Sequence, residues 1–431
     1  MLDIRFIRDN PDRVQEASRQ KGYDVDIKKL LELDGNRREL QQRVDELREK
    51  RNLNASKIKG GKPDQSIIDE GKQIKIELAK QEGYLSSADT EFIALLKLVP
   101  NMPHDDVPVG ASEDENVEVK VVGDKPQFDF TPKNHYEIAE AKGWLDKERA
   151  AKVAGSRFAY IMGDLVLLQQ AIIQWVMSTL TNEGKLTEII QANGVKTSSR
   201  PFIPVLPPLM IRTEPYDQMD RLQPSDDRYK IDGEELWLQG SAEHVLGSMH
   251  AGEIFEAEQL PLRYLGFATS FRKEAGTYGK DMEGLIRMHQ FDKLEMESFT
   301  TAEDSYQEHL FFIAIQEYLL QQLKLPYHVL MKCTVDIGKP NARGVDMEVW
   351  LPGQGKYRET HTADYMTDYQ ARRLQTRVRT PGGIELIHTN DATAFALGRC
   401  MVAIIENYQT ADGDVRIPDV LQPYMAGRQH I

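Results

Sequence analysis

The chain has 431 residues, of which 40% are hydrophobic and 28% charged, and this composition excludes a fibrous or wholly disordered protein. At ~150 residues per domain, the length predicts two or three domains with a sizeable core. Lys and Arg number 54 against 68 Asp and Glu, so the net charge of -14 excludes a uniformly basic nucleic-acid binder. A local basic patch is still allowed, because binding depends on how charge is distributed.

The cysteines and the hydropathy pattern indicate the compartment. Cys333 and Cys400 are far apart, which excludes a disulfide framework and a cysteine-rich zinc site. The N-terminal stretch is acidic in part and has no apolar run, so it lacks the pattern of a signal peptide. The most apolar stretch, 159–177, contains Asp164 and three glutamines and is no candidate for a membrane span. We expect a cytoplasmic protein that does not bind membranes.

Mostly apolar residues near the N-terminus recur with a period of 3.5, the spacing of a coiled-coil seam. One run occupies positions 30, 33, 37, 40, 44 and 47, and the next occupies positions 67, 71, 74, 78, 81, 85, 88, 92 and 95. The stretch 59–64 between them is rich in glycine and proline, which predicts a turn. Neither helix can bury its stripe alone, so we expect an antiparallel helical hairpin roughly 45 Å long.

The far end of this predicted hairpin is basic. Residues 48–62 contain one acid, Glu49, and six basic residues: Arg48, Lys50, Arg51, Lys57, Lys59 and Lys62. Their net charge of +5 leaves -19 for the rest of the chain. These side chains either form the solvated surface of a coiled coil or bind the phosphates of a nucleic acid.

A proline-rich linker separates the hairpin from the rest of the chain. Prolines at 100, 103 and 108 forbid a continuing helix. We therefore place one domain at residues 1–112 and a second, α+β domain at residues 113–431. In the second domain we predict helices over 156–180 and 304–323, and strands over 236–243, 266–274, 287–296 and 345–351.

Charged side chains share faces of these predicted strands. The segment 266–297 indicates an antiparallel hairpin around a glycine-rich loop. Arg272 and Glu274 would share one face of its first strand, and Phe291, Lys293 and Glu295 one face of its second. This surface is either solvated, with cross-strand ion pairs, or it is the floor of a pocket for a phosphate and a flat ring.

A second pair of polar residues lies in the predicted strand 236–243. Ser241 and Glu243 would point the same way, because strand side chains alternate. A hydroxyl beside a carboxylate suits a substrate ammonium, and an exposed edge strand is the alternative.

Two further segments carry candidate phosphate and metal ligands. From Ala394 to Ile405 the chain predicts a buried helix interrupted by Arg399, whose partner is either a structural carboxylate or a polyphosphate. Glu348 and Glu359 bracket a predicted strand–loop–strand, and carboxylate oxygens suit Mg²⁺ held jointly with phosphates. No P-loop motif and no GxGxxG that opens a helix is present.

Together these segments resemble the seryl-tRNA synthetases, a family of class II aminoacyl-tRNA synthetases, over nearly the whole chain. Residues 271–295 (FRKEAGTYGKDMEGLIRMHQFDKLE) resemble motif 2 of that family, and residues 396–399 (ALGR) resemble motif 3. Pro208 resembles the motif 1 proline of the dimer interface, and Ser241-Ala242-Glu243 resembles the TxE serine loop.

The resemblance implies a fold and an activity. The fold would be a tRNA-binding helical hairpin followed by a mostly antiparallel β-sheet flanked by helices, in a homodimer. The activity would be ATP-dependent activation of L-serine and its transfer to tRNA(Ser), and to tRNA(Sec) where one is present. The basic end of the hairpin would bind the tRNA.

The resemblance also implies roles for individual residues. Arg272 and Arg399 would be catalytic, contacting the α- and γ-phosphates of ATP, and Glu359 and Thr362 would hold Mg²⁺. The ATP site would comprise Arg272, Lys273, Glu274, Phe291, Glu359, Thr360, His361, Thr362 and Arg399, with Glu274 and Phe291 on the adenine. The serine site would comprise Ser241, Ala242, Glu243, Arg272, Glu295, Asp391 and Thr393, with Glu295 and Thr393 on the hydroxyl.

Three positions depart from the family pattern. Ser241 replaces the usual threonine of TxE, Thr362 replaces a serine at the metal site, and Asp391 replaces an asparagine. Each replacement keeps a group that can serve the same contact. The competing interpretations are a paralogue that charges a carrier protein, a synthetase for another amino acid, and a non-catalytic coiled-coil protein that binds nucleic acid. The basic hairpin argues against the first, and the charged strand faces argue against the last.

Overall fold

The computed structural model describes residues 1–58, 64–275 and 284–431. The chain divides into two compact units, Met1–Met102 and Pro103–Ile431. Residues 103–112 bond to the second unit: the amide of His104 donates to the carbonyl of Ala342 (2.8 Å) and that of Gly110 to Oγ1 of Thr334 (3.2 Å). The division therefore lies before the domain boundary expected after residue 112. Within the described residues, no helix combines the length and apolarity that a membrane span needs.

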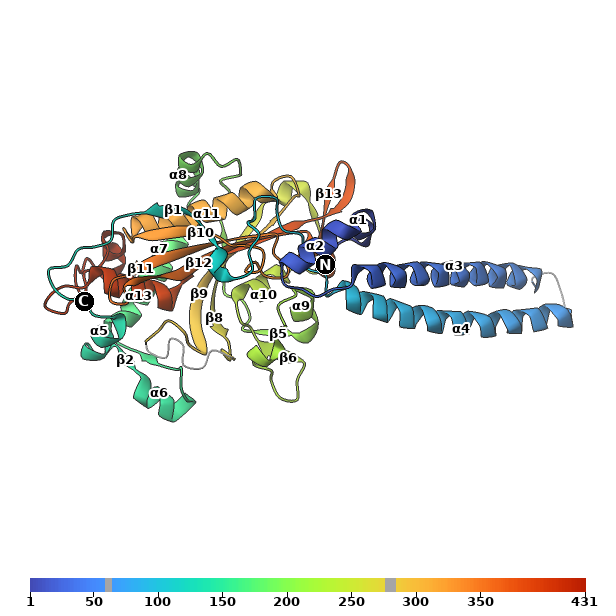
Figure 1. Ribbon diagram of the computed structural model, residues 1–431, viewed down its shortest axis with the longest axis horizontal. Helices are drawn as coiled ribbons and strands as arrows, with labels where there is room; N and C mark the ends of the chain where they lie inside the picture. Colours follow the sequence, from blue (N-terminus) through green and yellow to red (C-terminus); the bar gives the residue numbers. More distant parts are fainter. Residues whose placement is uncertain (59–63, 276–283) are drawn as a thin grey trace. The chain divides into compact units, whose positions relative to one another are not determined.

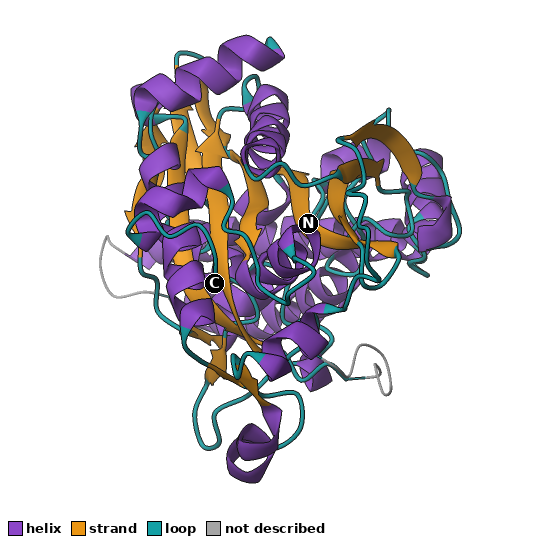
Figure 2. Cartoon of the chain, turned by 90° about the vertical axis from the view of Figure 1, so that its left-hand side faces the viewer, coloured by secondary structure: helices purple, strands orange, loops and turns teal. Residues whose placement is uncertain are grey.

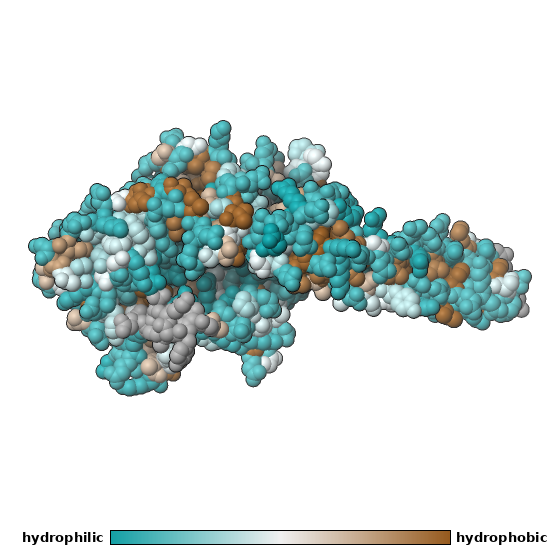
Figure 3. Space-filling model, viewed as in Figure 1, coloured by the Kyte–Doolittle hydropathy of each residue, from teal (hydrophilic) through white to brown (hydrophobic). Residues whose placement is uncertain are grey.

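The N-terminal unit contains the expected hairpin. Its helices are α1 (Ile4–Asp9), α2 (Pro11–Gln20), α3 (Ile27–Ile58) and α4 (Gln65–Leu96). Helices α3 and α4 lie side by side (Figure 1). Val44, Leu78 and Leu85 are buried between them, and every predicted seam position is buried or half-buried. Apolar and polar residues are interspersed on the surface of the hairpin (Figure 3), where Leu53 and Ile76 are exposed.

A polar residue lies within this seam. The amide of Asn54 is buried and donates to Oε2 of Glu70 (2.9 Å) and to the carbonyl of Ile67 (3.2 Å). Gly71 faces it on the opposite helix, and a Cβ at Gly71 would lie 3.0 Å from Oδ1 of Asn54. The glycine at an expected apolar position therefore makes room for the asparagine.

The second unit is built on an eight-stranded sheet within the described residues (Figure 2). Its spatial order is β1 (Val117–Val122), β10 (Tyr327–Met331), β11 (Arg343–Leu351), β12 (Lys356–Thr367), β15 (His388–Ala396), β9 (Gln290–Thr300), β8 (Leu262–Phe271) and β4 (Ile203–Val205). Neighbouring strands are antiparallel except β4 and β8. This confirms the predicted α+β fold with a mostly antiparallel sheet.

The two faces of this sheet have different environments. Leu294, Met296 and Phe395 point to one face and form a single apolar core with helices α7 (Asp164–Leu180), α11 (Ser305–Gln322) and α13 (Leu397–Tyr408). Side chains alternate along a strand, so Phe291 and Glu295 of β9 point to the other face. The register pairs Thr393 of β15 with Glu295. The charged face is thus open to ligands while the apolar face is covered.

Smaller elements surround the sheet. Short strands pair as β2 (Leu145–Asp146) with β3 (Tyr160–Ile161), β5 (Met210–Arg212) with β6 (Leu236–Leu238), and β14 (Gly383–Leu386) with β13 (Arg377–Thr380) and β7 (Ile254–Glu256). The remaining helices are α5 (His135–Ala141), α6 (Lys147–Ala154), α8 (Glu183–Asn193), α9 (Thr213–Gln218), α10 (Ala242–Gly247) and α12 (Tyr369–Leu374), with 3₁₀ turns η1 (Glu113–Glu115), η2 (Ser225–Asp227), η3 (Ala257–Gln259) and η4 (Asp419–Met425).

Several predicted boundaries are wrong in instructive ways. The strand expected over 236–243 ends at Leu238, and Glu243 lies in the first turn of α10. The strand expected over 266–274 ends at Phe271, so Arg272 and Glu274 lie beyond it, and Glu274 has a left-handed backbone (φ 53°). The helix expected from Ser156 begins at Asp164, and the one expected from Ala394 begins at Leu397, because Ala394–Ala396 complete β15.

Candidate active site

A cavity of about 290 Å³ opens on the charged face of the sheet. It brings together most of the expected site residues: Glu243, Arg272, Glu274, Phe291, Glu295, Glu359, Thr360, Thr362, Asp391, Thr393 and Arg399. They come from α10, from the β8–β9 connection and its return strand, from β12 and β15, and from the start of α13. The register of the sheet strands and the start of α13 thus bring together residues that are far apart in sequence.

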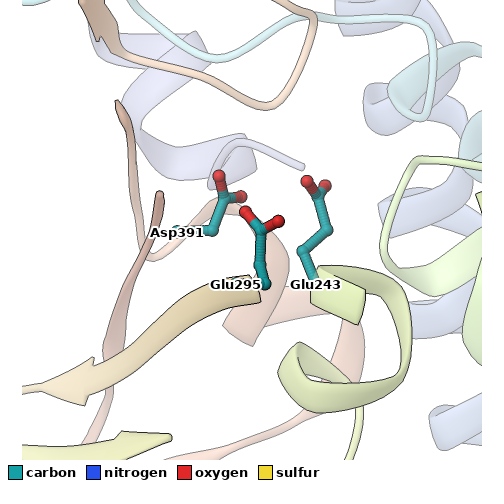
Figure 4. Close-up of side chains that lie close together, drawn as sticks. All are labelled: Glu243, Glu295 and Asp391. Atoms are coloured by element: carbon teal, nitrogen blue, oxygen red, sulfur yellow. The ribbon is translucent and has the colours of Figure 1, made fainter. Parts of the chain in front are cut away.

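Three carboxyl groups meet at one end of the cavity. Glu243, Glu295 and Asp391 are buried, and an oxygen of each lies within 4.8 Å of one from each of the others. They approach from α10, β9 and β15 (Figure 4). Oγ of Ser241 donates to Oε2 of Glu295 (3.5 Å). This end presents acceptors suited to an ammonium and a hydroxyl.

Two cations are interleaved with these acids. Arg221 is ion-paired through Nε with Oε1 of Glu243, and its Nη2 lies 3.6 Å from Oδ2 of Asp391. Lys293, on the same face of β9 as Glu295, is ion-paired with that carboxylate. Sequence reasoning placed Lys293 on this face without a role and missed Arg221, whose loop carries no local signal.

Burial and charge shift the pKa values at this end in opposite directions. Burial opposes ionisation of Glu243, but the guanidinium of Arg221 outweighs it and lowers the pKa to about 2. Burial raises the pKa of Glu295 to about 7 against the charge of Lys293. Burial and the charge of Glu243 raise the pKa of Asp391 well above its usual range. The three acids therefore resist being charged together.

An arginine and an aromatic ring form the middle of the cavity. Nε of Arg272 donates to the carbonyl of Gly240 (3.0 Å), and its guanidinium lies 5.3 Å from the centre of the Phe291 ring. Glu274 is ion-paired with Arg287. The sequence analysis assigned no role to Arg287, which lies in the predicted strand 287–296 but before the observed start of β9 at Gln290. A flat ring and a phosphate are the ligands that these groups suit.

The other end combines a carboxylate, a hydroxyl and an arginine. Oγ1 of Thr362 donates to Oε1 of Glu359 (3.2 Å), and Nη1 of Arg399 lies 3.1 Å from the same oxygen. Burial opposes ionisation of Glu359, but Arg399 outweighs it and lowers the pKa to about 2. Glu359 is thus the carboxylate partner that was one of the two alternatives for Arg399. This ion pair does not prevent Arg399 from also binding a polyphosphate, the other alternative.

The oxygen atoms at this end fit a hard cation. Asp346 of β11 is directly opposite Thr362 of β12, and among the described residues its buried Oδ1 has no hydrogen-bond partner. Lys332 lies 3.6 Å from the other oxygen of Asp346. Carboxylate and hydroxyl oxygens are suitable ligands for Mg²⁺. Glu348, by contrast, bonds to His328 (2.7 Å).

Four expected residues do not line the cavity. Ser241 and Ala242 are buried outside its lining, with Ala242 in a small apolar cluster. Lys273 is exposed, with its ammonium 5.7 Å from the Tyr229 ring. His361 is buried on the apolar face, bonded to Oγ1 of Thr360 (2.8 Å).

The expected tRNA and dimer residues lie on the surface where they are described. Arg48 pairs with Glu82 (2.9 Å) and Lys57 with Glu70 (3.7 Å), whereas Lys50 and Arg51 are exposed. Lys59 and Lys62 lie outside the described residues. Pro208 is exposed beside three exposed apolar residues, Leu206, Leu209 and Met210.

This sheet and its cavity can be compared with known proteins. Residues 228–408 match the model of the tRNA synthetase class II core domain (G, H, P, S and T), and residues 1–103 match that of the seryl-tRNA synthetase N-terminal domain. The fold and site thus define a class II aminoacyl-tRNA synthetase. Serine–tRNA ligases of Thermodesulfovibrio yellowstonii (39% identical, 99% of both chains covered) and Methanocella arvoryzae (40%, 100% of both) are similar over the full length. The chain belongs to the seryl-tRNA synthetase family.

Solved structures agree with this assignment. The seryl-tRNA synthetase of Pyrococcus horikoshii, complexed with ATP, matches with a TM-score of 0.88 at 35% identity and covers 100% of this chain and 99% of its own. The cytoplasmic serine–tRNA ligase of Naegleria fowleri, complexed with AMP, matches with a TM-score of 0.83 at 27% identity and covers 98% and 95%.

Proposed function

We propose that the chain activates L-serine with ATP and transfers the seryl group to tRNA(Ser), and to tRNA(Sec) where one is present. The observation that carries the proposal is one cavity with two chemically distinct ends. The acidic end suits an amino acid, and Arg272 and Arg399 suit a polyphosphate. The solved relatives in complex with ATP and AMP support a nucleotide in this chain as well.

In the first step the serine carboxylate attacks the α-phosphorus of ATP, a P–O bond forms, and pyrophosphate leaves. The carboxylate is already an anion at neutral pH, so the step needs no general base. Arg272 lies between the two ends of the cavity, where it contacts both the serine carboxylate and the α-phosphate. Its guanidinium holds the reacting atoms together and neutralises the charge that develops on phosphorus.

The nucleotide is held by side chains on both sides of Arg272. Phe291 stacks on the adenine, Glu274 accepts from its amino group, and Arg399 binds the γ-phosphate. Glu359 and Thr362 would hold Mg²⁺, and the free oxygen of Asp346 lies opposite Thr362. Bound there, Mg²⁺ would neutralise charge on the phosphates. Lys273, Thr360 and His361 contribute to ATP binding through their backbone groups or by positioning the side chains that contact ATP.

Serine is selected by its hydroxyl group. Glu243 receives the ammonium, assisted by Asp391, while Ser241 orients Glu295. Glu295 and Thr393, paired across β9 and β15, bond the hydroxyl. Alanine would lack the bonds to both side chains, and the loss of such bonds reduces kcat/KM by up to ~10⁴-fold where a site is built around them. Ala242 packs beneath the pocket and fixes the first turn of α10.

Transfer follows when the ribose hydroxyl at the 3′ end of the tRNA attacks the seryl carbonyl and AMP leaves. The basic residues Arg48, Lys50, Arg51, Lys57, Lys59 and Lys62 bind the tRNA backbone. The protein acts in the cytoplasm as a homodimer, and the exposed apolar residues around Pro208 form its interface.

The function is tested by ATP–pyrophosphate exchange with each of the twenty amino acids, followed by charging of a tRNA mixture with the amino acid selected. We expect exchange with serine and charging of tRNA(Ser). Exchange with threonine in preference to serine, or undiminished exchange after chelation of Mg²⁺, would contradict the proposal.

A further inference from the structure

The acidic end of the cavity holds two cations for which the proposed chemistry has no use. Arg221 contacts Glu243 and Asp391, and Lys293 contacts Glu295. Arg221 is held from other directions as well, because its Nη2 donates to Oδ1 of Asn341 (3.3 Å). These cations are therefore fixed parts of the pocket.

Resident cations already balance the acids at this end. Arg221 is ion-paired with Glu243, and Lys293 is ion-paired with Glu295. Burial raises the pKa values of Asp391 and of Asp364, which also lines the cavity, so these two carboxyl groups resist ionisation. This end therefore has little uncompensated negative charge for a ligand that brings two positive charges.

An amino acid with a second ammonium group poses a particular problem for this pocket. L-2,3-Diaminopropionate has the size of serine and carries an ammonium where serine has a hydroxyl. Cavity volume cannot reject it, and a lone carboxylate such as Glu295 would attract it. Close unit charges of like sign repel strongly in a buried site, so only a resident cation can oppose its entry.

We propose that Arg221 and Lys293 are specificity-determining residues that exclude amino acids with a second ammonium group from the serine pocket. This inference rests on the proposed function, because it concerns the same pocket. Lys293 lies against the carboxylate that would bind the second ammonium. Arg221 balances the negative charge of Glu243 and lies beside Asp391.

The test measures inhibition of serine-dependent pyrophosphate exchange by L-2,3-diaminopropionate. The quantity compared is its inhibition constant divided by the KM for serine. In Arg221→Gln this ratio should fall by about 10- to 100-fold, because one like charge is gone. In Arg221→Lys, which keeps the charge, it should stay near the wild-type value. Lys293→Gln should shift it in the same direction as Arg221→Gln.

A charge-conserving variant at the second cation tests the role of charge itself. Lys293→Arg keeps a cation beside Glu295, so its ratio should stay near the wild-type value. Arg228→Gln is the matched control, because Arg228 lines the same cavity but pairs with Asp227 (2.7 Å), and its ratio should be unchanged.

The outcomes separate this inference from the proposed function. Lack of serine-dependent exchange in the wild-type protein would refute the function. Normal wild-type exchange with a ratio in Arg221→Gln within about twofold of the wild-type value would overturn the inference alone. If Arg221→Gln does not fold, Lys293→Gln is compared with Lys293→Arg, whose ratio should exceed that of Lys293→Gln at least tenfold, and equal ratios would overturn the inference.

Discussion

The helical hairpin and the candidate active-site cavity hold their charges in opposite surroundings. In the hairpin, Arg48 and Glu82 form a pair whose side chains are each nearly half exposed. In the cavity, Arg221 and Glu243 are almost enclosed, and the arginine lowers the pKa of the acid to about 2. An exposed pair contributes ~0–1 kcal/mol, whereas a buried charge cannot lose its partner cheaply. Hairpin charges are therefore available to a partner molecule, and cavity charges restrict what can enter.

Deleting residues 37–88 should separate the two regions most strongly. Nη1 of Arg37 lies 3.6 Å from Oδ1 of Asp89, so the deletion joins residues 36 and 89 where the two helices lie side by side. We expect aminoacylation of tRNA to fall about a thousandfold or more, because the phosphate contacts are lost. Pyrophosphate exchange, measured on the same preparation, should stay within about twofold of the full-length value. A parallel loss of both activities would mean that the hairpin also supports the cavity.

Arg399→Ala should have a large effect on the use of ATP. We expect kcat/KM for ATP in pyrophosphate exchange to fall about a hundred- to a thousandfold, because the leaving pyrophosphate loses a guanidinium that neutralises its charge. The Tm should fall by no more than about 4 °C, since Glu359 keeps its bond to Thr362. If Arg399 serves only as the ion-pair partner of Glu359, the Tm will collapse while the folded fraction binds ATP normally.

Glu295→Ala should weaken the choice of serine over alanine. Loss of a charged hydrogen bond to a buried hydroxyl costs about 2–3 kcal/mol, which corresponds to roughly 30- to 150-fold in the ratio of kcat/KM values. Exchange assays with the two amino acids give this ratio directly. An unchanged ratio would remove Glu295 from the pocket.

Glu295 should also make stability depend on pH. Its pKa is raised from 4.5 to about 7 by burial, so between these values the folded protein keeps a proton that the unfolded chain releases. The resulting stabilisation, up to roughly 3 kcal/mol, is complete below pH 4.5 and disappears as the pH rises to 7. Glu295→Gln cannot titrate, so the stability of the wild type relative to this variant should decline from pH 5 to 7. Urea unfolding of both proteins checks the sign, and a rising difference would contradict it.

Single charges at the basic end of the hairpin should have the smallest effects. Lys50→Ala and Arg51→Ala should each reduce the slope of log affinity for tRNA against log salt by about 1. Lys29→Ala, an exposed residue at the opposite end of the hairpin, is the control and should leave the slope unchanged. If Lys50→Ala and Arg51→Ala keep the wild-type slope, as Lys29→Ala should, tRNA binds elsewhere.

The hairpin was predictable from sequence because its determinants are local. The period of 3.5 residues specifies both helices and the seam between them, and Val44 and Leu78 are buried there as expected. The order of strands in the sheet had no such signal. It depends on contacts between residues as distant as Thr393 and Glu295, whose pairing follows from the register of two strands.

In the cavity, residue types were predicted better than their geometry. Strand alternation placed Arg272 with Glu274 and Ser241 with Glu243 on common faces. The structure instead places Arg272 and Glu274 beyond the end of β8, and Glu243 on a helix. Arg221 was missed because its partners, Glu243 and Asp391, lie 22 and 170 residues further along the chain. A buried charge network has no periodicity that a single sequence could reveal.

The buried Asn54 has a consequence for the reach of the molecule. Sliding α4 along α3 by one heptad would move its residues about 10 Å and leave the amide of Asn54 without Glu70 and opposite a side chain larger than Gly71. An apolar seam alone would tolerate such a slip. The asparagine and glycine together fix the register of α4 against α3. The basic end of the hairpin therefore stays at a set distance from its base.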